Sequence, residues 1–234
     1  AVFLRRVYVD TIGTLPTMEE AKAFLDDNAR DKRAKLIDSL LERPEFADYW
    51  AMKWCDILRV KAEFPIKLWP NAAQAYHRWI RNSIKNNMPY DEFTRELLTS
   101  SGSNFRKPQV NFYRAVQSKT PEGIASAVAL TFLCERTDQW PQERLDGMSS
   151  FFARVGFKGT GEWKEEIVYF DRRRGTPTDS DLYEARLPND VTVEIPRDQD
   201  PRKVFADWLV KLSLALVALV PFRLLVTRFS PEVG

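Results

Sequence analysis

Apolar residues spaced three and four positions apart predict amphipathic helices along the first two thirds of the chain. Thr17 and Glu20 form a capping box that starts one of these helices. Thr120 followed by Pro121 is an N-cap with proline at the first helical position. The helix that it starts is apolar on nearly every side, which indicates a central buried helix. The other predicted helices pass through residues 36–41, 44–58, 73–84, 93–98 and 141–155.

The pattern changes after residue 156. Residues 166–170 are β-prone, and residues 190–195 alternate as a strand does. Residues 172–177 contain a glycine and a proline, which are typical of a turn, so we expect the two strands to form a small hairpin. The predicted fold class is mainly α: a multi-helix, orthogonal bundle-like domain with a β-hairpin near the C-terminal third.

The end of the chain combines a helix with an uncharged run. Pro201 starts the predicted helix, and residues 212–222 carry no charge. Eleven residues are too few for a membrane span, which needs about 20. We therefore expect a core or docking helix, and membrane contact through residues 209–229 is the less favoured alternative.

The predicted organisation is a helical domain over residues 1–156, a hairpin extension over 157–199 and a C-terminal helix over 200–234. The last segment is interpreted as the truncated start of a following domain. Because the chain starts without methionine inside a structured segment, we interpret it as an excised or processed piece.

Composition narrows the function classes only slightly. Of the 234 residues, 44% are apolar. The chain has 35 Lys and Arg residues and 33 Asp and Glu residues, so its net charge is +2. This balance argues against a nucleic-acid partner. Cys55 and Cys134 cannot form a disulfide framework, although a single bridge between them stays open.

Asp56, Arg59 and Glu63 are spaced to form an ion-pair ladder at a helix end. An exposed ladder of this kind has a structural role. A buried one would orient the following loop through Trp69 and Asn71.

Residues 100–111 form the loop that most favours ligand binding, because amide and guanidinium side chains alternate there with aromatic ones. Asn104, Arg106 and Asn111 suit a carbohydrate or another polar ligand, and an aromatic-lined groove is expected beside them. The alternative is a long loop held closed by its own aromatic side chains.

Catalytic chemistry has weaker support. His77 is the only histidine, so a multi-histidine metal site is excluded, and an inert helix histidine is favoured over a general base or an iron ligand. Glu162, Glu165 and Glu166 are candidates for the carboxylate pair of a glycoside hydrolase, although a solvated acidic cluster is the favoured interpretation.

Several blocks in order carry a resemblance to a known family. They are residues 3–17, 31–38, 50–59, 78–80, 89–93, 138–140 with 151–152, and 200–208. On these blocks the chain resembles a domain-of-unknown-function family associated with planctomycete-type cytochromes, and it is DUF1549-like.

The resemblance implies a bacterial protein exported to the periplasm or another extracytoplasmic location, joined to a second domain and often to a cytochrome c module. Similar proteins often carry a Cys-x-x-Cys-His haem-attachment motif just after the central helix. Here residues 134–138 read Cys-Glu-Arg-Thr-Asp, so the second cysteine and the histidine are missing. We expect no haem, no metal and no other cofactor.

The leading hypothesis is an uncharacterised helical module with a ligand-binding or assembly role. Its partner is a following domain or a polysaccharide-type ligand. The alternatives are a polysaccharide-acting hydrolase domain and a redox-associated module that has lost its haem. The candidate ligand-binding residues are Arg59, Glu63, Trp69, Asn71, His77, Asn104, Arg106 and Asn111.

Overall fold

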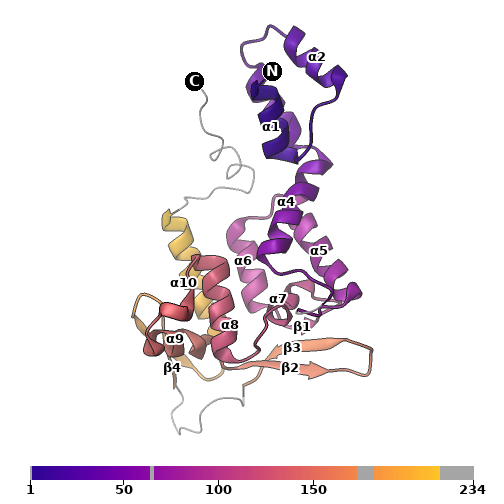
Figure 1. Cartoon of the computed structure of the whole chain (residues 1–234). Helices are drawn as coiled ribbons and strands as arrows, with labels where there is room; N and C mark the ends of the chain where they lie inside the picture. Colours follow the sequence, from indigo (N-terminus) through magenta and orange to yellow (C-terminus); the bar gives the residue numbers. More distant parts are fainter. Residues whose placement is uncertain (1, 64–65, 173–181, 217–234) are drawn as a thin grey trace. The chain divides into compact units, whose positions relative to one another are not determined.

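The computed structural model describes residues 2–63, 66–172 and 182–216 (Figure 1). These residues divide into two compact units. The first unit takes the described parts of Ala1–Asp56 and Ile80–Tyr90, and the second takes those of Ile57–Trp79 and Asp91–Ala218. Each unit is described by itself. The described chain is mainly α-helical, with two small antiparallel sheets.

The first unit is built from helices α1 (Val2–Ile12), α2 (Met18–Asp26), α3 (Lys32–Leu41) and most of α4 (Pro44–Ile57). Its core takes apolar side chains from α1, α3 and α4. They are Leu4, Val7, Tyr8, Ile12, Leu40, Leu41, Phe46, Ala47 and Ala51. Trp50 donates its indole N–H to the carbonyl oxygen of Thr11 at 3.1 Å, which fixes α4 against the end of α1.

Local sequence signals set the helix ends as predicted. The capping box is confirmed: Thr17 accepts from the Glu20 amide, and the Glu20 carboxylate accepts from the Thr17 amide. Gly13 ends α1 with φ of +71°, a conformation that side chains with a Cβ rarely adopt. A Cβ at Gly13 would lie 2.3 Å from the ring of Tyr49, so the close approach also requires glycine.

The second unit contains most of the remaining helices. They are α5 (Pro70–Lys85, as far as Trp79), α6 (Tyr90–Thr99, from Asp91), α7 (Asn111–Arg114), α8 (Pro121–Val128), α9 (Gln142–Ser149) and α10 (Pro201–Leu216). Thr120 caps α8 by accepting from the Gly123 amide, with proline at the first helical position, as predicted. The apolar run beyond α8 becomes a π-helical turn, Ala129–Leu133, in which Leu130 is exposed.

The strands pair differently from the predicted hairpin. β3 (Glu166–Phe170) lies between β1 (Gly102–Ser103) and β2 (Val155–Gly159). β5 (Thr192–Pro196) pairs with β4 (Leu182–Arg186) in a second sheet. The prediction that residues 166–170 and 190–195 pair with each other was therefore wrong. Each of the two segments has a nearer partner in the chain, and the alternation of side chains does not name that partner.

Helix α10 contributes to the core of the second unit. The Phe205 ring contacts those of Phe151 and Phe152 at centroid distances of 5.3 and 5.4 Å. Arg202 is 1% exposed, and its guanidinium binds the carboxylate of Asp200 and the carbonyl oxygen of Ser100. The described part of the predicted C-terminal helix is thus a core helix.

The structural units differ in extent from the predicted segments 1–156, 157–199 and 200–234, which stay predictions as domains. Among the described residues, none of the helices combines the length and the hydropathy of a membrane span. The uncharged run 212–222 lies mostly outside the described residues, as does most of the segment 209–229. Cys55 and Cys134 are both free thiols.

Candidate functional site

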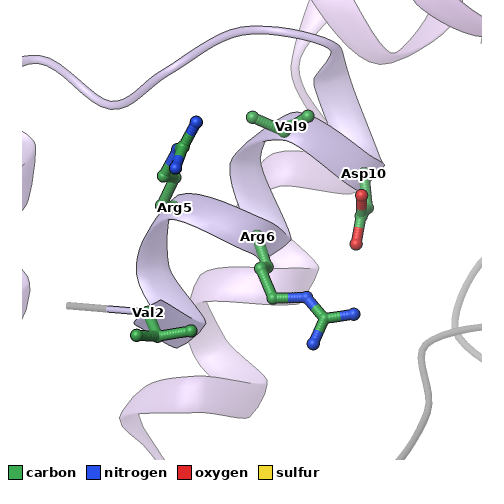
Figure 2. Close-up of a pocket in the computed structure, with 5 residues that line it drawn as sticks. All are labelled: Val2, Arg5, Arg6, Val9 and Asp10. Atoms are coloured by element: carbon green, nitrogen blue, oxygen red, sulfur yellow. The ribbon is translucent and has the colours of Figure 1, made fainter.

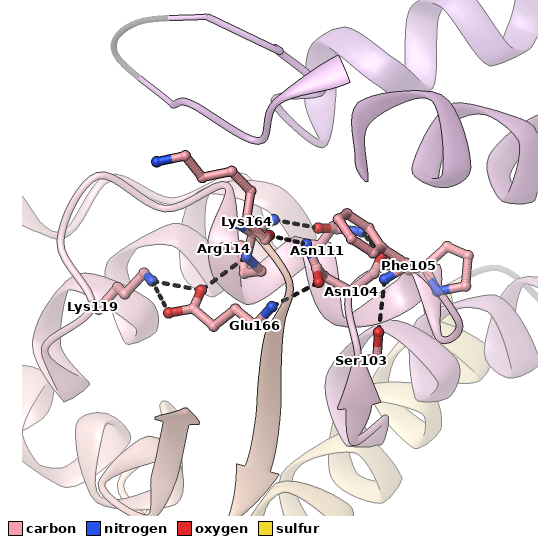
Figure 3. Close-up of polar contacts among 9 residues, drawn as sticks. Ser103, Asn104, Phe105, Asn111, Arg114, Lys119, Lys164 and Glu166 are labelled. Carbon is pink, nitrogen blue, oxygen red and sulfur yellow. Dashed lines mark hydrogen bonds and ion pairs between the residues drawn. The ribbon is translucent and has the colours of Figure 1, made fainter. Parts of the chain in front are cut away.

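Asn104 joins the loop after α6 to the β2–β3 hairpin. It follows β1, and its backbone amide donates to the carbonyl oxygen of Glu166 at 3.0 Å. Its side-chain oxygen accepts from the Glu166 amide at 2.9 Å, and its side-chain nitrogen donates to the carbonyl oxygen of Lys164 at 3.3 Å (Figure 3). Asn104 is fully buried. Its amide therefore completes the sheet where the hairpin turns.

We call the hydrogen bonds of the Asn104 side chain to Lys164 and Glu166 the clamp. The carboxylate of Glu166 also binds two cationic side chains (Figure 3). Arg114 donates to its carboxylate at 2.8 Å, and Lys119 donates at 2.9 and 3.0 Å. Burial acts to raise the pKa of Glu166, but the hydrogen bonds from Lys119 and Arg114 outweigh it, and the net shift is downward. Asn111 accepts from Arg114 at 3.0 Å and donates to the Asn104 carbonyl oxygen at 2.8 Å. The network is satisfied internally.

The hairpin tip, defined as residues Thr160–Glu165, is ordered by its own hydrogen bonds. The Glu165 carboxylate accepts from the hydroxyls of Ser103 and Thr160. The hydrogen bond from Ser103 contributes most to lowering the pKa of Glu165. The Glu162 amide donates to the Thr160 hydroxyl at 3.1 Å. Lys164 has φ of +60°, so the chain turns sharply there. The tip is therefore a loop held in place by hydrogen bonds.

This ordered tip presents an exposed tryptophan. Trp163 is 68% exposed, and its ring meets the Trp69 ring nearly edge-on, at a centroid distance of 5.3 Å and an angle of 64°. The Lys164 ammonium lies 4.4 Å from the Trp69 centroid and 5.5 Å from the Trp163 centroid. In Figure 3 the Lys164 side chain extends away from the polar network. We call Trp69, Trp163 and Lys164 the aromatic platform.

The structure separates the predicted ligand-binding residues into three groups. Asn104 and Asn111 are fully buried, and both amides bind protein groups. The predicted loop therefore folds as β1, a 3-10 turn and α7, and these amides hold it closed. Trp69 is half-buried in the platform, and it is the one member of the prediction that contacts the hairpin tip through an aromatic ring.

Of the other predicted residues, Arg106 acts on the hairpin tip, because its charge contributes to lowering the pKa of Glu165. Glu63, Asn71, His77 and Arg106 are exposed. Arg59 is partly buried; one guanidinium nitrogen reaches the Ala127 carbonyl oxygen at 3.5 Å, and the other is buried with no hydrogen-bond partner among the described residues. Burial lowers the pKa of Arg59. The ladder of Arg59 with Glu63 is not among the ion pairs that the described residues form.

Sequence reasoning missed Trp163 and Lys164. The available signal was Gly159 and Gly161 beside a tryptophan, between two β-prone segments. Glycine between two β-prone segments is typical of a hairpin tip. The pattern does not predict that Trp69, which is distant in sequence, lies beside Trp163.

None of the described carboxyl groups with a shifted pKa has the raised pKa of a glycoside hydrolase general acid. The general acid of such an enzyme has a raised pKa. The carboxyl groups with shifted pKa are Glu20, Glu45, Glu165 and Glu166, and all four are lowered. Among the described residues no three His, Cys, Asp or Glu side chains gather closely enough to hold a metal ion.

Two surface hollows lie in the first unit. One, of about 480 Å³, runs along α1 between Val2 and Asp10, and Arg5 and Arg6 extend to opposite sides there (Figure 2). The other, of about 540 Å³, lies between residues 12–17 and α4. Its cation, Arg43, is already bound by Glu20 and Glu45 at 2.7 Å each. Neither hollow has a buried polar group left over for a ligand.

The sequence of residues 1–152 matches the family PSCyt2, described as "Protein of unknown function (DUF1549)". The match covers about two thirds of the chain. The chain belongs to this family. Comparison with curated proteins and with solved structures finds no match. The DUF1549 match ends inside the second unit, and the platform combines Trp69 from the matched part with Trp163 and Lys164 from beyond it.

Proposed function

We propose that the second unit is a non-catalytic polysaccharide-binding module of an exported bacterial protein, and that the aromatic platform is its binding surface. The observation that carries the proposal is the exposed ring of Trp163, held beside Trp69 on an ordered hairpin tip. A tryptophan ring that has only a structural role is normally buried by its own chain, because burying the ring is strongly favourable.

The order of the tip supports binding rather than mere exposure. Association is weakened by the entropy of every side chain and loop that becomes fixed at the interface. Here Asn104 and Glu165 have fixed the tip beforehand, through hydrogen bonds to Lys164, Glu166, Ser103 and Thr160. A ligand that stacks on Trp163 therefore meets a surface that needs little further ordering.

A sugar ring has the matching chemistry. One face carries C–H groups that pack on an indole ring, and its hydroxyls bind polar side chains at the edge. Asn71 is exposed two residues after Trp69, and the charge of the exposed Arg106 reaches Glu165 of the tip, so we assign both to that edge. Glu63 and His77 stay predictions.

The hydrolase alternative has weaker support, since the lowered pKa values of Glu165 and Glu166 suit hydrogen-bond acceptors and not a general acid. An extracytoplasmic location, an association with cytochromes and contact with a following domain belong to the same proposal and rest on the family resemblance.

The test is binding of the full chain to soluble polysaccharides, by affinity electrophoresis and by titration calorimetry with oligosaccharides. Covering about 100 Å² of Trp163 contributes about 2.5 kcal/mol, so Trp163→Ala should weaken binding more than tenfold. Trp140→Ala is the matched control, because Trp140 is also a partly exposed ring with a cation, Arg144, lying 3.7 Å above it.

Circular dichroism of both variants shows whether the fold is kept. Equal affinity of wild type and Trp163→Ala for every polysaccharide that binds would overturn the proposal. So would the absence of binding to a panel that covers neutral, acidic and amino sugars.

A further inference from the structure

The ammonium of Lys164 lies at the centre of the platform. Its nitrogen is within cation–π range of both tryptophan rings, at 4.4 and 5.5 Å. Lys164 itself is exposed. The cation is thus placed where a ligand on Trp163 would meet it.

No described carboxylate forms an ion pair with this ammonium. The two acids that follow it in sequence are engaged elsewhere, and the exposed Glu162, two residues before it, forms no ion pair among the described residues. Glu165 binds the hydroxyls of Ser103 and Thr160, and Glu166 binds Arg114 and Lys119. The donors of Lys164 that do not face the rings therefore remain available to a ligand.

The backbone conformation at Lys164 also supports a role of this residue in ligand binding. Its φ of +60° is uncommon for a residue with a Cβ, and glycine or asparagine is the usual occupant. Across this turn the backbone amide of Thr160 donates to the carbonyl oxygen of Glu165 at 3.3 Å. The strained position carries a long cation that reaches the rings.

We propose that the platform selects acidic glycans, whose sugars bear a carboxylate or a sulfate, and that Lys164 binds this anionic group while the adjoining ring stacks on Trp163. The inference rests on the proposed function and names the ligand class of the same surface. Selection acts at contact range, because Glu162 and Glu165 on the tip offset the charge of Lys164 and Lys158 at longer distance.

Charge-assisted contacts of an ammonium with an anionic oxygen are the stronger class of hydrogen bond. We therefore expect the full chain to bind an oligogalacturonate at least about tenfold more tightly than its methyl ester, which keeps the backbone and removes the charge. A sulfated glycan paired with its desulfated form tests the second source of the anion in the same way.

Three variants make the test specific. Lys164→Gln removes the charge and should bring the acid-to-ester ratio to within about threefold, while Lys164→Arg keeps the charge and should retain the preference. Lys158→Gln is the matched control, since Lys158 is an exposed lysine on β2 of the same hairpin.

The outcomes separate this inference from the proposed function. If Lys164→Gln keeps the full acid preference, or if wild type shows none while Trp163→Ala still weakens binding, the charge selection is overturned and the polysaccharide module stands. If no glycan binds, both fail. A preference for either anion that Lys164→Gln abolishes and Lys158→Gln leaves intact supports the inference.

Discussion

Replacing Asn104 by alanine tests the clamp that orders the hairpin tip. The variant removes two side-chain hydrogen bonds, the acceptor for the Glu166 amide at 2.9 Å and the donor to the Lys164 carbonyl oxygen at 3.3 Å. Each is worth about 1 kcal/mol when made, and an unpaired buried group costs about 1–3 kcal/mol. Because Asn104 is fully buried, water does not easily replace the lost partners. We expect the free energy of unfolding of the second unit to fall by about 2–4 kcal/mol.

Urea unfolding of the full chain, followed by tryptophan fluorescence, measures the global effect. Hydrogen exchange measures the local one: the Glu166 amide loses its acceptor, and a loss of about 2 kcal/mol lowers its protection about thirtyfold. Asn71→Ala is the matched control, because Asn71 is exposed. A change below about 0.5 kcal/mol in Asn104→Ala, with unchanged protection at Glu166, would refute the reasoning.

Three further predictions concern other positions. The pKa of Glu166 is lowered in the folded state. The ionised carboxylate therefore stabilises the fold fully above the unfolded pKa of about 4.5, and this contribution is lost as pH falls through the folded pKa. Between pH 7 and 3 the urea midpoint should fall more steeply for wild type than for Glu166→Gln. Gly13→Ala should destabilise the first unit by about 1–3 kcal/mol in thermal unfolding, since it strains φ of +71° and meets Tyr49 at 2.3 Å, whereas Gly159→Ala, with nothing within 4 Å, should cost nothing measurable. Arg59→Met should raise the free energy of unfolding by about 1 kcal/mol, because removing a half-buried cation with an unpaired nitrogen outweighs the loss of its 3.5 Å hydrogen bond to the Ala127 carbonyl oxygen. A fall of similar size in that free energy would contradict this reasoning.

The short-range signals in the sequence correctly predicted the starts of two helices. The capping box at Thr17 and the Thr120–Pro121 start both have the predicted hydrogen bonds. These signals act within three or four residues, so the chain specifies them without its tertiary structure. Strand pairing acts over longer separations, and residues 166–170 took the two-residue strand β1 as a partner, which no alternation pattern reveals.

The site shows the same limit more sharply. The sequence predicts Asn104 and Asn111 as ligand-binding residues from their residue type among aromatic neighbours, yet both amides bind protein groups. An amide side chain serves a backbone clamp and a ligand equally well, so only burial tells the two roles apart. The sequence predicts Trp69 as a ligand-binding residue, and the structure leaves it half-buried, but the sequence does not predict its partner Trp163.

The sequence by itself determined the helix starts, the absence of a Cys-x-x-Cys-His segment and the family of the chain. The tertiary structure alone decided which side chains face water. It buried Asn104 between two strands and left Trp163 exposed beside Trp69, because these contacts depend on folding together segments that are distant in sequence. Short-range spacing encodes the helices. The platform exists only once the hairpin reaches the loop before α5, and that meeting is a property of the folded chain.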